Sequence, residues 1–322
     1  MTNERTLETL PQQDSSNGLP TRCLGWTNEQ VSILCLGGWH IGFAAQKDPR
    51  QAIRIMHSAI DEGINFFDNC WEYHDGLSEE IMGEALSTGN RRQKILLMTK
   101  NCGRDYEESR LNLESSLQRL QTDYIDLWQF HELLYDNDPD WIFEKGGLKY
   151  ALEAQKAGKV RYIGFTGHKD PRIHRKMLDK PYHWATAQMP INLMDAHYRS
   201  FQREILPICL EKKVGVIAMK SLGGSVNGTG KIPSDTEFTV RECRSYALSL
   251  PIASLCVGIT SMKELKQDLD IARNFKPLSE TVRKQLLAKA ELEAGDGRHE
   301  LFKSTQIFDG PHHRQQHCFP ID

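Results

Sequence analysis

Short apolar segments alternate with helical segments along most of this chain of 322 residues, and this alternation limits its possible folds more than any other feature. Short, nearly continuous apolar runs are typical of strands that are buried on both faces of a parallel sheet. Helical periodicity separates them; Met262, Leu265 and Leu269, for example, follow one another at spacings of three and four residues. The predicted strands span residues 31–36, 64–69, 94–100, 124–130, 160–166, 184–189, 214–220 and 254–259.

Eight strand–helix units of roughly 30 residues each predict an α/β fold, the (β/α)8 TIM barrel. A doubly wound open sheet is the alternative, but residues 36–42 read Leu-Gly-Gly-Trp-His-Ile-Gly and lack the G-x-G-x-x-G spacing of that fold. The segment PTRCLGWTNEQ before the first strand predicts an N-terminal β-hairpin that caps the barrel floor. We expect a flexible leader over residues 1–18 and one barrel domain over residues 19–322, with a C-terminal extension from about residue 277.

Charge and composition exclude several classes of protein. The 40 Lys and Arg residues and 43 Asp and Glu residues leave a net charge of −3, so no overall basic field favours binding to nucleic acid or to an anionic membrane. No apolar run approaches the roughly 20 residues that cross a bilayer, and the polar start lacks the features of a secretory signal or a transit peptide. We therefore expect a cytoplasmic protein. No sequence feature predicts its oligomeric state.

The spacing of cysteine and histidine predicts neither a disulfide framework nor a metal site. The eight cysteines form no C-x-x-C pair, and we interpret Cys70 and Cys102, beside two strand ends, as packed side chains. His312, His313 and His317 lie together in the tail, but their spacing fits no compact zinc finger. We expect a mobile tail or a flap over the functional site there, and no bound metal.

Four ionisable residues follow three consecutive predicted strands. Asp68 ends the second strand, Tyr73 comes five residues later, Lys100 ends the third strand and His131 follows the fourth. Each alone has an ordinary structural interpretation: a turn, a packed ring, a solvated amine or a hydrogen-bonding imidazole. Because the carboxyl ends of barrel strands share one face, we expect the four side chains to meet at one mouth.

Proton donation coupled to hydride transfer needs this set of side chains. A free tyrosine has a pKa of about 10, and a nearby Lys100 ammonium is expected to lower the pKa of Tyr73 toward the working pH. Asp68 would keep Lys100 charged and in place, and His131 would orient a carbonyl oxygen. Because no amino acid supplies hydride, a nicotinamide cofactor is implied.

The chain resembles the aldo-keto reductases. The family's Asp, Tyr, Lys and His match Asp68, Tyr73, Lys100 and His131, including the five-residue step from Asp to Tyr. The segments INFFDNCWEYHDGLSEEIMGEAL, DYIDLWQFH, GKVRYIGFTGH and GITSMKELKQDL match in the same order, from about Arg22 to Phe275. The resemblance implies a barrel with a nicotinamide-dependent carbonyl reductase or alcohol dehydrogenase activity.

The resemblance also implies positions that bind the nicotinamide and the pyrophosphate. Family members hold the carboxamide with a Ser-Asn pair and a Gln, where this chain has Thr166, Gly167 and Gln188. Met219 stands where many relatives stack a Tyr on the nicotinamide ring. The glycine-rich segment 220–225 is expected to wrap the pyrophosphate through its backbone amides.

Residues 258–268 are expected to face the adenosine phosphate. Where many relatives place an Arg against the 2′-phosphate, this chain has Glu264, with Lys263 beside it, while Gln267 and Asp268 stand where the family contacts adenine. NADP(H) is therefore the expected cofactor, and NAD(H) is the alternative. The expected cofactor contacts are Gly38, Trp39, Asp68, Thr166, Gln188, Met219, Lys220, Leu222, Gly223, Gly258, Thr260, Lys263, Gln267 and Asp268.

Trp39, Trp71, Tyr73 and His131 are expected to line the substrate pocket, and the substrate class is a small aldehyde, ketone or sugar. Two other functions remain open: a Schiff-base aldolase that uses Lys100 as nucleophile, and a non-catalytic nicotinamide-binding sensor or regulatory subunit. A metal-dependent hydrolase is excluded because the first strand is not followed by His-x-His.

Overall fold

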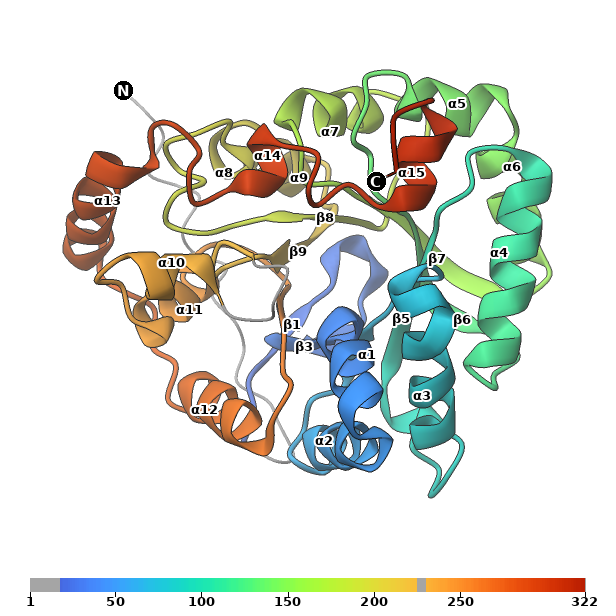
Figure 1. The fold of residues 1–322 in the computed structure, drawn as a ribbon, viewed down its shortest axis with the longest axis horizontal. Helices are drawn as coiled ribbons and strands as arrows, with labels where there is room; N and C mark the ends of the chain where they lie inside the picture. Colours follow the sequence, from blue (N-terminus) through green and yellow to red (C-terminus); the bar gives the residue numbers. More distant parts are fainter. Residues whose placement is uncertain (1–17, 225–229, 322) are drawn as a thin grey trace.

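Eight parallel strands close into a barrel, each beside the strand that precedes it in the chain, which confirms the predicted α/β fold (Figure 1). The computed structural model describes residues 18–224 and 230–321. Residues 1–17 of the predicted leader lie outside this part. The ring closes where Leu255 of the last strand pairs with Leu34 of the first. The barrel strands are β3 (Leu34–Gly37), β4 (Phe66–Asp68), β5 (Leu96–Asn101), β6 (Ile125–Phe130), β7 (Val160–Thr166), β8 (Thr186–Pro190), β9 (Gly215–Met219) and β10 (Ser254–Val257).

An antiparallel hairpin closes the floor of the barrel, as predicted. Its strands are β1 (Thr21–Cys23) and β2 (Gln30–Ser32). The apolar run 31–36, predicted as one strand, therefore divides between β2 and β3. Ser32 lies at the division and its hydroxyl donates to the carbonyl oxygen of Leu34 at 2.6 Å. The hairpin fills the floor with apolar side chains that pack inside the barrel: Leu24 and Val31 with Cys35, Phe66, Leu96, Met98, Leu127, Ile217 and Ala253.

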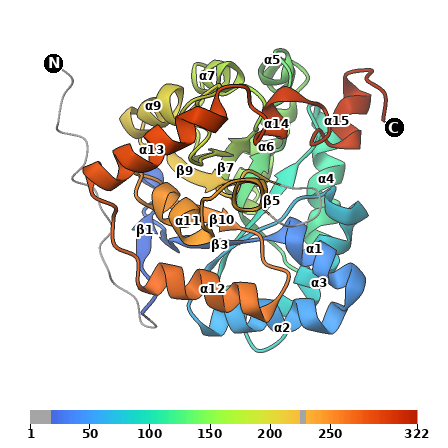
Figure 2. The same cartoon turned by 60° about the vertical axis from the view of Figure 1, so that its left-hand side comes forward.

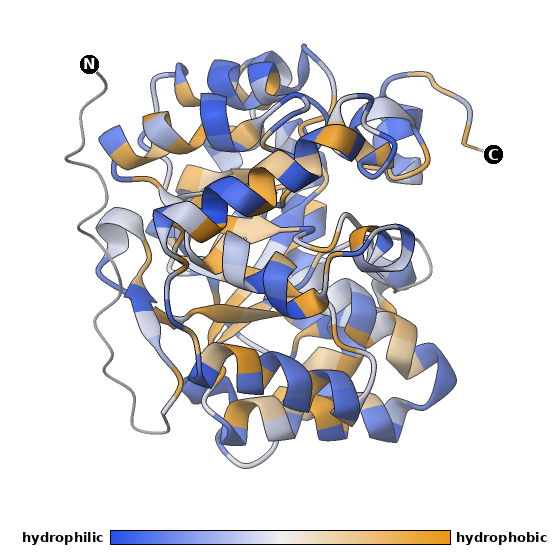
Figure 3. Ribbon diagram, turned by 90° about the vertical axis from the view of Figure 1, so that its left-hand side faces the viewer, coloured by the Kyte–Doolittle hydropathy of each residue, from blue (hydrophilic) through white to orange (hydrophobic). Residues whose placement is uncertain are grey.

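The helices surround the barrel with their apolar faces turned toward the strands. In Figure 3 the outer helices carry both blue and orange residues, whereas the barrel strands are largely orange. Gly63 and Gly158 have positive φ angles of 99° and 77° where a helix turns into the next strand, a conformation that glycine adopts without strain. The helices are α1 (Gly38–Lys47), α2 (Pro49–Asp61), α3 (Leu77–Leu86), α4 (Tyr106–Arg119), α5 (Asp138–Glu144), α6 (Gly147–Lys156), α7 (Pro171–Leu178), α8 (Phe201–Glu204), α9 (Leu206–Glu211), α10 (Lys231–Asp235), α11 (Val240–Leu248) and α12 (Met262–Arg273).

The C-terminal extension is folded and runs past the mouth of the barrel. It contains α13 (Glu280–Ala294), α14 (Leu301–Ser304) and α15 (Pro311–Gln316). Figures 1 and 2 show these three helices following one another along one side of the molecule. The end of α15 lies beside α5, where His317 Nε2 is 3.0 Å from Asp138 Oδ1. None of the helices in the two described stretches is long and apolar enough to cross a bilayer.

Candidate active site

Asp68 and Lys100 form a buried ion pair at the carboxyl ends of β4 and β5. Lys100 Nζ donates to Asp68 Oδ1 at 2.5 Å and to the carbonyl oxygen of Asn69 at 2.6 Å. Cys256 Sγ donates to the other carboxylate oxygen of Asp68 at 3.5 Å. Burial lowers the pKa of Lys100, but the charge of Asp68, the charge of Cys70 and the hydrogen bond to Asp68 together outweigh burial and raise that pKa above its usual value. Lys100 therefore stays charged at neutral pH.

Tyr73 reaches this pair from a strained turn. Lys100 Nζ donates to Tyr73 Oη at 3.2 Å, and the tyrosine ring stands edge-on to the rings of Trp39 and His131, with centroids 5.3 and 5.7 Å away. His74 and Asp75, which follow in the 3-10 helix Tyr73–Gly76, have left-handed φ angles of 54° and 56°. This conformation costs a non-glycine residue about 1–3 kcal/mol and occurs often at functional sites.

The pKa of Tyr73 differs from the sequence-based expectation, in which the Lys100 ammonium lowers it. Burial, and then the negative charge of Asp68, raise the pKa of Tyr73 well above its usual value. Asp68 offsets the field of the ammonium because it is the nearest partner of Lys100. In the absence of ligand the phenol thus keeps its proton, which is the form that can donate to a carbonyl oxygen.

A cavity of about 800 Å³ opens at this end of the barrel. Its volume lies in the range of sites for small molecules and cofactors. Trp39 is 41 % exposed on its wall, a large apolar surface that a ligand could cover. His131 is not on this wall; it is buried and contacts the ring of Tyr73. The predicted site residues on the wall are Trp39, Asp68, Trp71, Tyr73, Gln188, Met219, Lys220, Leu222 and Gly258.

The other predicted cofactor residues do not line the cavity. A Cβ atom on Gly38 would lie 2.5 Å from the carbonyl oxygen of Asp68, so packing requires glycine there. Thr260 Oγ1 donates to Glu264 Oε2 at 2.9 Å in the cap of α12, and Lys263 and Gln267 point to solvent. The remaining residues of this set are Thr166, Gly223 and Asp268. Ser225, at the end of the predicted pyrophosphate loop, lies outside the described residues.

Arg244 lines the cavity and was missed in the sequence. Its Nε donates to Asp268 Oδ1 at 3.1 Å and its Nη1 to Ser221 Oγ at 2.7 Å. Asp268, predicted to contact adenine, is thus paired with Arg244 instead. The position of Arg244 in the helical pattern could have indicated its role, because a charged residue there falls on the apolar face of α11, between the buried residues Cys243 and Ala247.

The loop between α14 and α15, together with the first two residues of α15, forms another part of the wall, from Ile307 to His312. The backbone N–H of Gly310 donates to Glu132 Oε2 at 2.8 Å, and Lys169 Nζ lies 2.5 Å from Asp309 Oδ1. A Cβ atom on Gly310 would lie 2.6 Å from Glu72 Oε1. These contacts hold the extension against the mouth, in the place where the sequence predicts a flap or a mobile tail.

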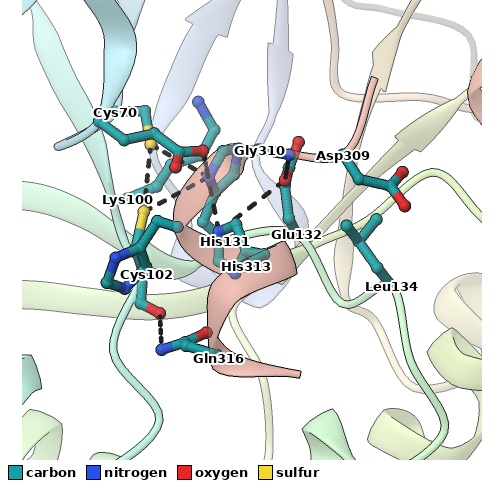
Figure 4. A network of polar contacts seen from close by, with 12 residues as sticks. Cys70, Lys100, Cys102, His131, Glu132, Leu134, Asp309, Gly310, His313 and Gln316 are labelled. Atoms are coloured by element: carbon teal, nitrogen blue, oxygen red, sulfur yellow. Dashed lines mark hydrogen bonds and ion pairs between the residues drawn. The ribbon is translucent and has the colours of Figure 1, made fainter. Parts of the chain in front are cut away.

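His131 is surrounded by groups that the sequence did not associate with it. Its Nδ1 lies 3.0 Å from Glu72 Oε1, 3.2 Å from Cys70 Sγ and 3.6 Å from Cys102 Sγ (Figure 4). Burial, and then the charge of Lys100, lower the pKa of His131 well below its usual value. The imidazole is therefore neutral, with one nitrogen that carries hydrogen and one that does not.

Known proteins resemble this chain in sequence. The model of the Aldo/keto reductase family matches residues 33–240. The uncharacterized oxidoreductase YrpG of Bacillus subtilis (strain 168) is 33% identical over 236 residues, which cover 66% of this chain and 69% of that protein. The aldo-keto reductase YhdN of the same organism is 30% identical over 233 residues, covering 68% and 67% of the two chains.

Solved structures agree with the sequence match. The holo form of the aldo-keto reductase AKR11C1 from Bacillus halodurans superposes with a TM-score of 0.70 and 25% sequence identity, covering 88% of this chain and 99% of that one. Members of this family are oxidoreductases that bind nicotinamide cofactors and act on carbonyl or alcohol groups. The family match, the barrel and the grouping of Asp68, Tyr73 and Lys100 agree with the resemblance noted in the sequence, and this chain belongs to the aldo/keto reductase family.

Proposed function

We propose that this oxidoreductase transfers hydride between a nicotinamide and the carbonyl carbon of a small aldehyde, ketone or sugar, while Tyr73 exchanges the proton with the carbonyl oxygen. The observation that carries this proposal is the contact of 3.2 Å between Lys100 Nζ and Tyr73 Oη, with Tyr73 and Asp68 on the cavity wall. The bound nicotinamide supplies the hydride, which no side chain can supply.

Each residue near Tyr73 has a distinct role in this proposal. Tyr73 gives its proton to the carbonyl oxygen as negative charge develops there. Lys100, held by Asp68, then stabilises the tyrosinate that forms. His131, which is neutral and buried against the Tyr73 ring rather than on the cavity wall, is the proposed orienter of the carbonyl oxygen. Trp39 and Trp71 provide apolar walls for the substrate.

The donors along the cavity suit a nicotinamide dinucleotide. Gln188 Oε1 accepts from Gln129 Nε2 at 2.9 Å, which leaves the amide N–H groups of Gln188 for the carboxamide oxygen. Lys220 and Arg244 place positive charge on the wall, where phosphate groups need it. Lys263 is exposed at the start of α12, outside the cavity wall, and we propose that it pairs with a 2′-phosphate. We propose NADPH as the preferred donor and NADH as the weaker one.

The test is the oxidation of NADPH and of NADH by the purified protein across a panel of aldehydes, ketones and aldoses. Tyr73→Phe is expected to lower the rate by roughly 10²–10⁴-fold, because it removes the proton donor and keeps the ring. Tyr182→Phe is the matched control, since Tyr182 packs edge-on against Trp184 outside the cavity. Its rate should stay close to that of the wild type.

Two other outcomes would replace this proposal. Cofactor binding without turnover on any substrate would favour the sensor or regulatory subunit. If neither cofactor binds and borohydride traps a substrate on Lys100, the protein is a Schiff-base aldolase. Equal rates for Tyr73→Phe and the wild type would remove Tyr73 from the chemistry.

A further inference from the structure

Four side chains that can bind a metal converge behind Tyr73, at the carboxyl ends of three neighbouring strands. Cys70 and Glu72 follow β4, Cys102 follows β5 and His131 follows β6. We call these four residues the His131 cluster. Each offers one ligand atom, and these atoms all lie within 4.8 Å of one another. We propose that the His131 cluster binds one zinc ion through Cys70 Sγ, Cys102 Sγ, His131 Nδ1 and Glu72 Oε1.

The distances within the cluster fit tetrahedral zinc. Zn–S bonds of about 2.3 Å and Zn–N or Zn–O bonds of about 2.0–2.1 Å place two sulfur atoms about 3.8 Å apart, sulfur and nitrogen about 3.6 Å apart, and nitrogen and oxygen about 3.4 Å apart. The corresponding distances here are 3.9 Å between the sulfur atoms, 3.2 and 3.6 Å from sulfur to His131 Nδ1, and 3.0 Å from His131 Nδ1 to Glu72 Oε1. Small adjustments would bring the four atoms onto one ion.

Backbone contacts already hold the ligands in place. The N–H of Cys70 donates to Asn69 Oδ1 at 2.8 Å, and the N–H of Cys102 donates to Asn112 Oδ1 at 2.9 Å. The N–H of His131 donates to the carbonyl oxygen of Asn101 at 2.8 Å. Cys70 and Cys102 are fully buried, and Figure 4 shows both side chains beside the imidazole of His131. A site whose ligands are positioned before binding loses little conformational freedom when the ion enters.

The charge of the cluster also suits a divalent cation. Burial raises the pKa of Cys70 and of Cys102, so both are thiols without the ion and each releases its proton when zinc binds. The two thiolates and the carboxylate would then carry three negative charges, and zinc would leave one, which the neighbouring Lys100 opposes through its field at Cys70. Without an ion the carboxylate is incompletely satisfied, because Glu72 Oε2 is buried and has no hydrogen-bond partner among the described residues. Cys70, Cys102 and His131 are also the donor types of known zinc sites.

A second set of ligands, with Glu132 and His313 in place of the cysteines, is close enough but less suitable. Arg104 Nη2 lies 3.3 Å from His313 Nδ1, and a guanidinium only donates. His313 Nδ1 therefore accepts, and Nε2 carries the hydrogen and has no lone pair for a metal. That nitrogen lies 3.8 Å from Glu72 Oε1, where it can orient the carboxylate from outside.

Zinc on Nδ1 would also fix the tautomer of His131. Nε2 would then carry the hydrogen, which makes the imidazole a hydrogen-bond donor of the kind that a carbonyl oxygen needs. The zinc inference does not rest on the reductase activity, because metal content is measured without substrate or cofactor. If the reductase proposal fails, the zinc proposal is unaffected, and the reverse also holds.

The experiment uses the full chain, stripped with a chelator under reducing conditions and then loaded with Zn²⁺ or Co²⁺. After gel filtration, elemental analysis is expected to find about one zinc ion per chain. The cobalt protein is expected to show the charge-transfer absorption of thiolate ligands. The variant Cys70→Ala/Cys102→Ala should lower the affinity by more than the roughly 10- to 100-fold that loss of an outer partner costs.

Two controls separate the alternatives. Cys209→Ala removes a buried thiol outside the cluster and should keep the metal. His313→Ala should also keep it, with weaker binding, since His313 acts from outside. Retention in the double cysteine variant with loss in His313→Ala would replace the proposed ligand set by the second one.

Three results would overturn the proposal: a reduced wild type without zinc, a cobalt protein without thiolate absorption, or a Cys70–Cys102 disulfide in the protein as isolated. The cobalt spectrum decides the matter on the wild type alone if the double variant does not fold.

Discussion

Two buried polar clusters lie where the C-terminal extension meets the barrel, and they differ in how their charges are balanced. The first, which we call the Lys303 cluster, consists of Asn192, Asp195, Glu300 and Lys303. Lys303 Nζ donates to Asp195 Oδ1 at 2.6 Å and to Glu300 Oε2 at 2.9 Å, and Asn192 Nδ2 donates to Glu300 Oε1 at 2.9 Å. A cation between two carboxylates thus completes this cluster from the chain itself.

Around the His131 cluster and its neighbours Glu132 and His313, no lysine or arginine among the described residues forms an ion pair with Glu72 or Glu132. Glu72 and Glu132 repel each other, and burial followed by the charge of Glu72 raises the pKa of Glu132 well above its usual value. Glu72 Oε2 and His313 Nε2 are buried without hydrogen-bond partners among the described residues, whereas no side-chain atom of the Lys303 cluster is left so. Removal of the cation from a compensated cluster leaves buried charges unpaired, whereas a cluster with spare donors and acceptors can bind a ligand.

The largest expected effect is on the compensated cluster. Lys303→Met leaves Asp195 and Glu300 buried without their cation and should lower the free energy of unfolding by about 3–5 kcal/mol, measured in urea. The control is Lys284→Met, which breaks an exposed pair with Glu280 and should cost under about 0.5 kcal/mol. Equal losses for the two variants would show that the ammonium does not hold the cluster together.

A second test uses His174, which is a buried imidazole like His131 and His313. Unlike theirs, its pKa is set by burial and by one backbone carbonyl rather than by nearby charges. Burial lowers the pKa of His174 to about 4, and only the carbonyl oxygen of Gln188 opposes it. The unfolded chain, with a histidine pKa of about 6.5, binds more protons than the folded protein between these values. Stability is therefore present at neutral pH and is lost as the pH falls through this window.

The expected loss at His174 is about 2 kcal/mol between pH 7 and pH 5, since each unit of pKa shift corresponds to about 1.4 kcal/mol. Urea unfolding of the wild type and of His174→Gln at both pH values measures it as a difference of differences. His183→Gln, at an exposed position, is the control. If both variants keep the pH dependence of the wild type, burial of His174 does not keep its imidazole neutral in the folded protein.

The barrel could be predicted from the sequence because strands buried on both faces leave apolar runs that are easy to locate. The one mistake, at residues 31–36, arose because Val31 and Leu34 are both buried, although they belong to different sheets. The predicted meeting of Asp68, Tyr73 and Lys100 followed from their positions at strand ends, and topology brings such ends together.

Other parts of the site depend on contacts that no local pattern contains. Arg244 pairs with Asp268 from a different helix, and Gly310 reaches Glu132 across 178 positions of the chain. Cys70 and Cys102 lie beside strand ends as Asp68 and Lys100 do, but packing was the simpler interpretation of these two thiols. A charged residue at a strand end indicates a functional site, whereas an uncharged thiol at the same place does not.

Local stability should differ between α14 and α15, the two helices that attach the C-terminal extension to the barrel. In α14, Phe302 and Lys303 are buried, whereas His313 is the buried residue of α15. We expect the amides of α15 to exchange hydrogen at an opening free energy about 2 kcal/mol below those of α14 in metal-free protein. Native-state hydrogen exchange measures both helices in one sample, and greater protection of α15 would reverse the comparison.

The smallest expected effect concerns a single side chain that joins α15 to the barrel. Gln316 Nε2 donates to the carbonyl oxygen of Cys102 at 3.1 Å and to Glu108 Oε2 at 2.9 Å. Gln316→Met keeps the length of the side chain and removes both bonds, so it should cost about 1 kcal/mol in urea unfolding. Gln306→Met, whose amide contacts Tyr135 Oη at 3.5 Å in an exposed position, should change stability by less than about 0.5 kcal/mol. Because Gln316 is bonded to the backbone of Cys102, its loss should also loosen that residue; a variant as stable as the control would mean that α15 is held mainly by His313 and Gly310.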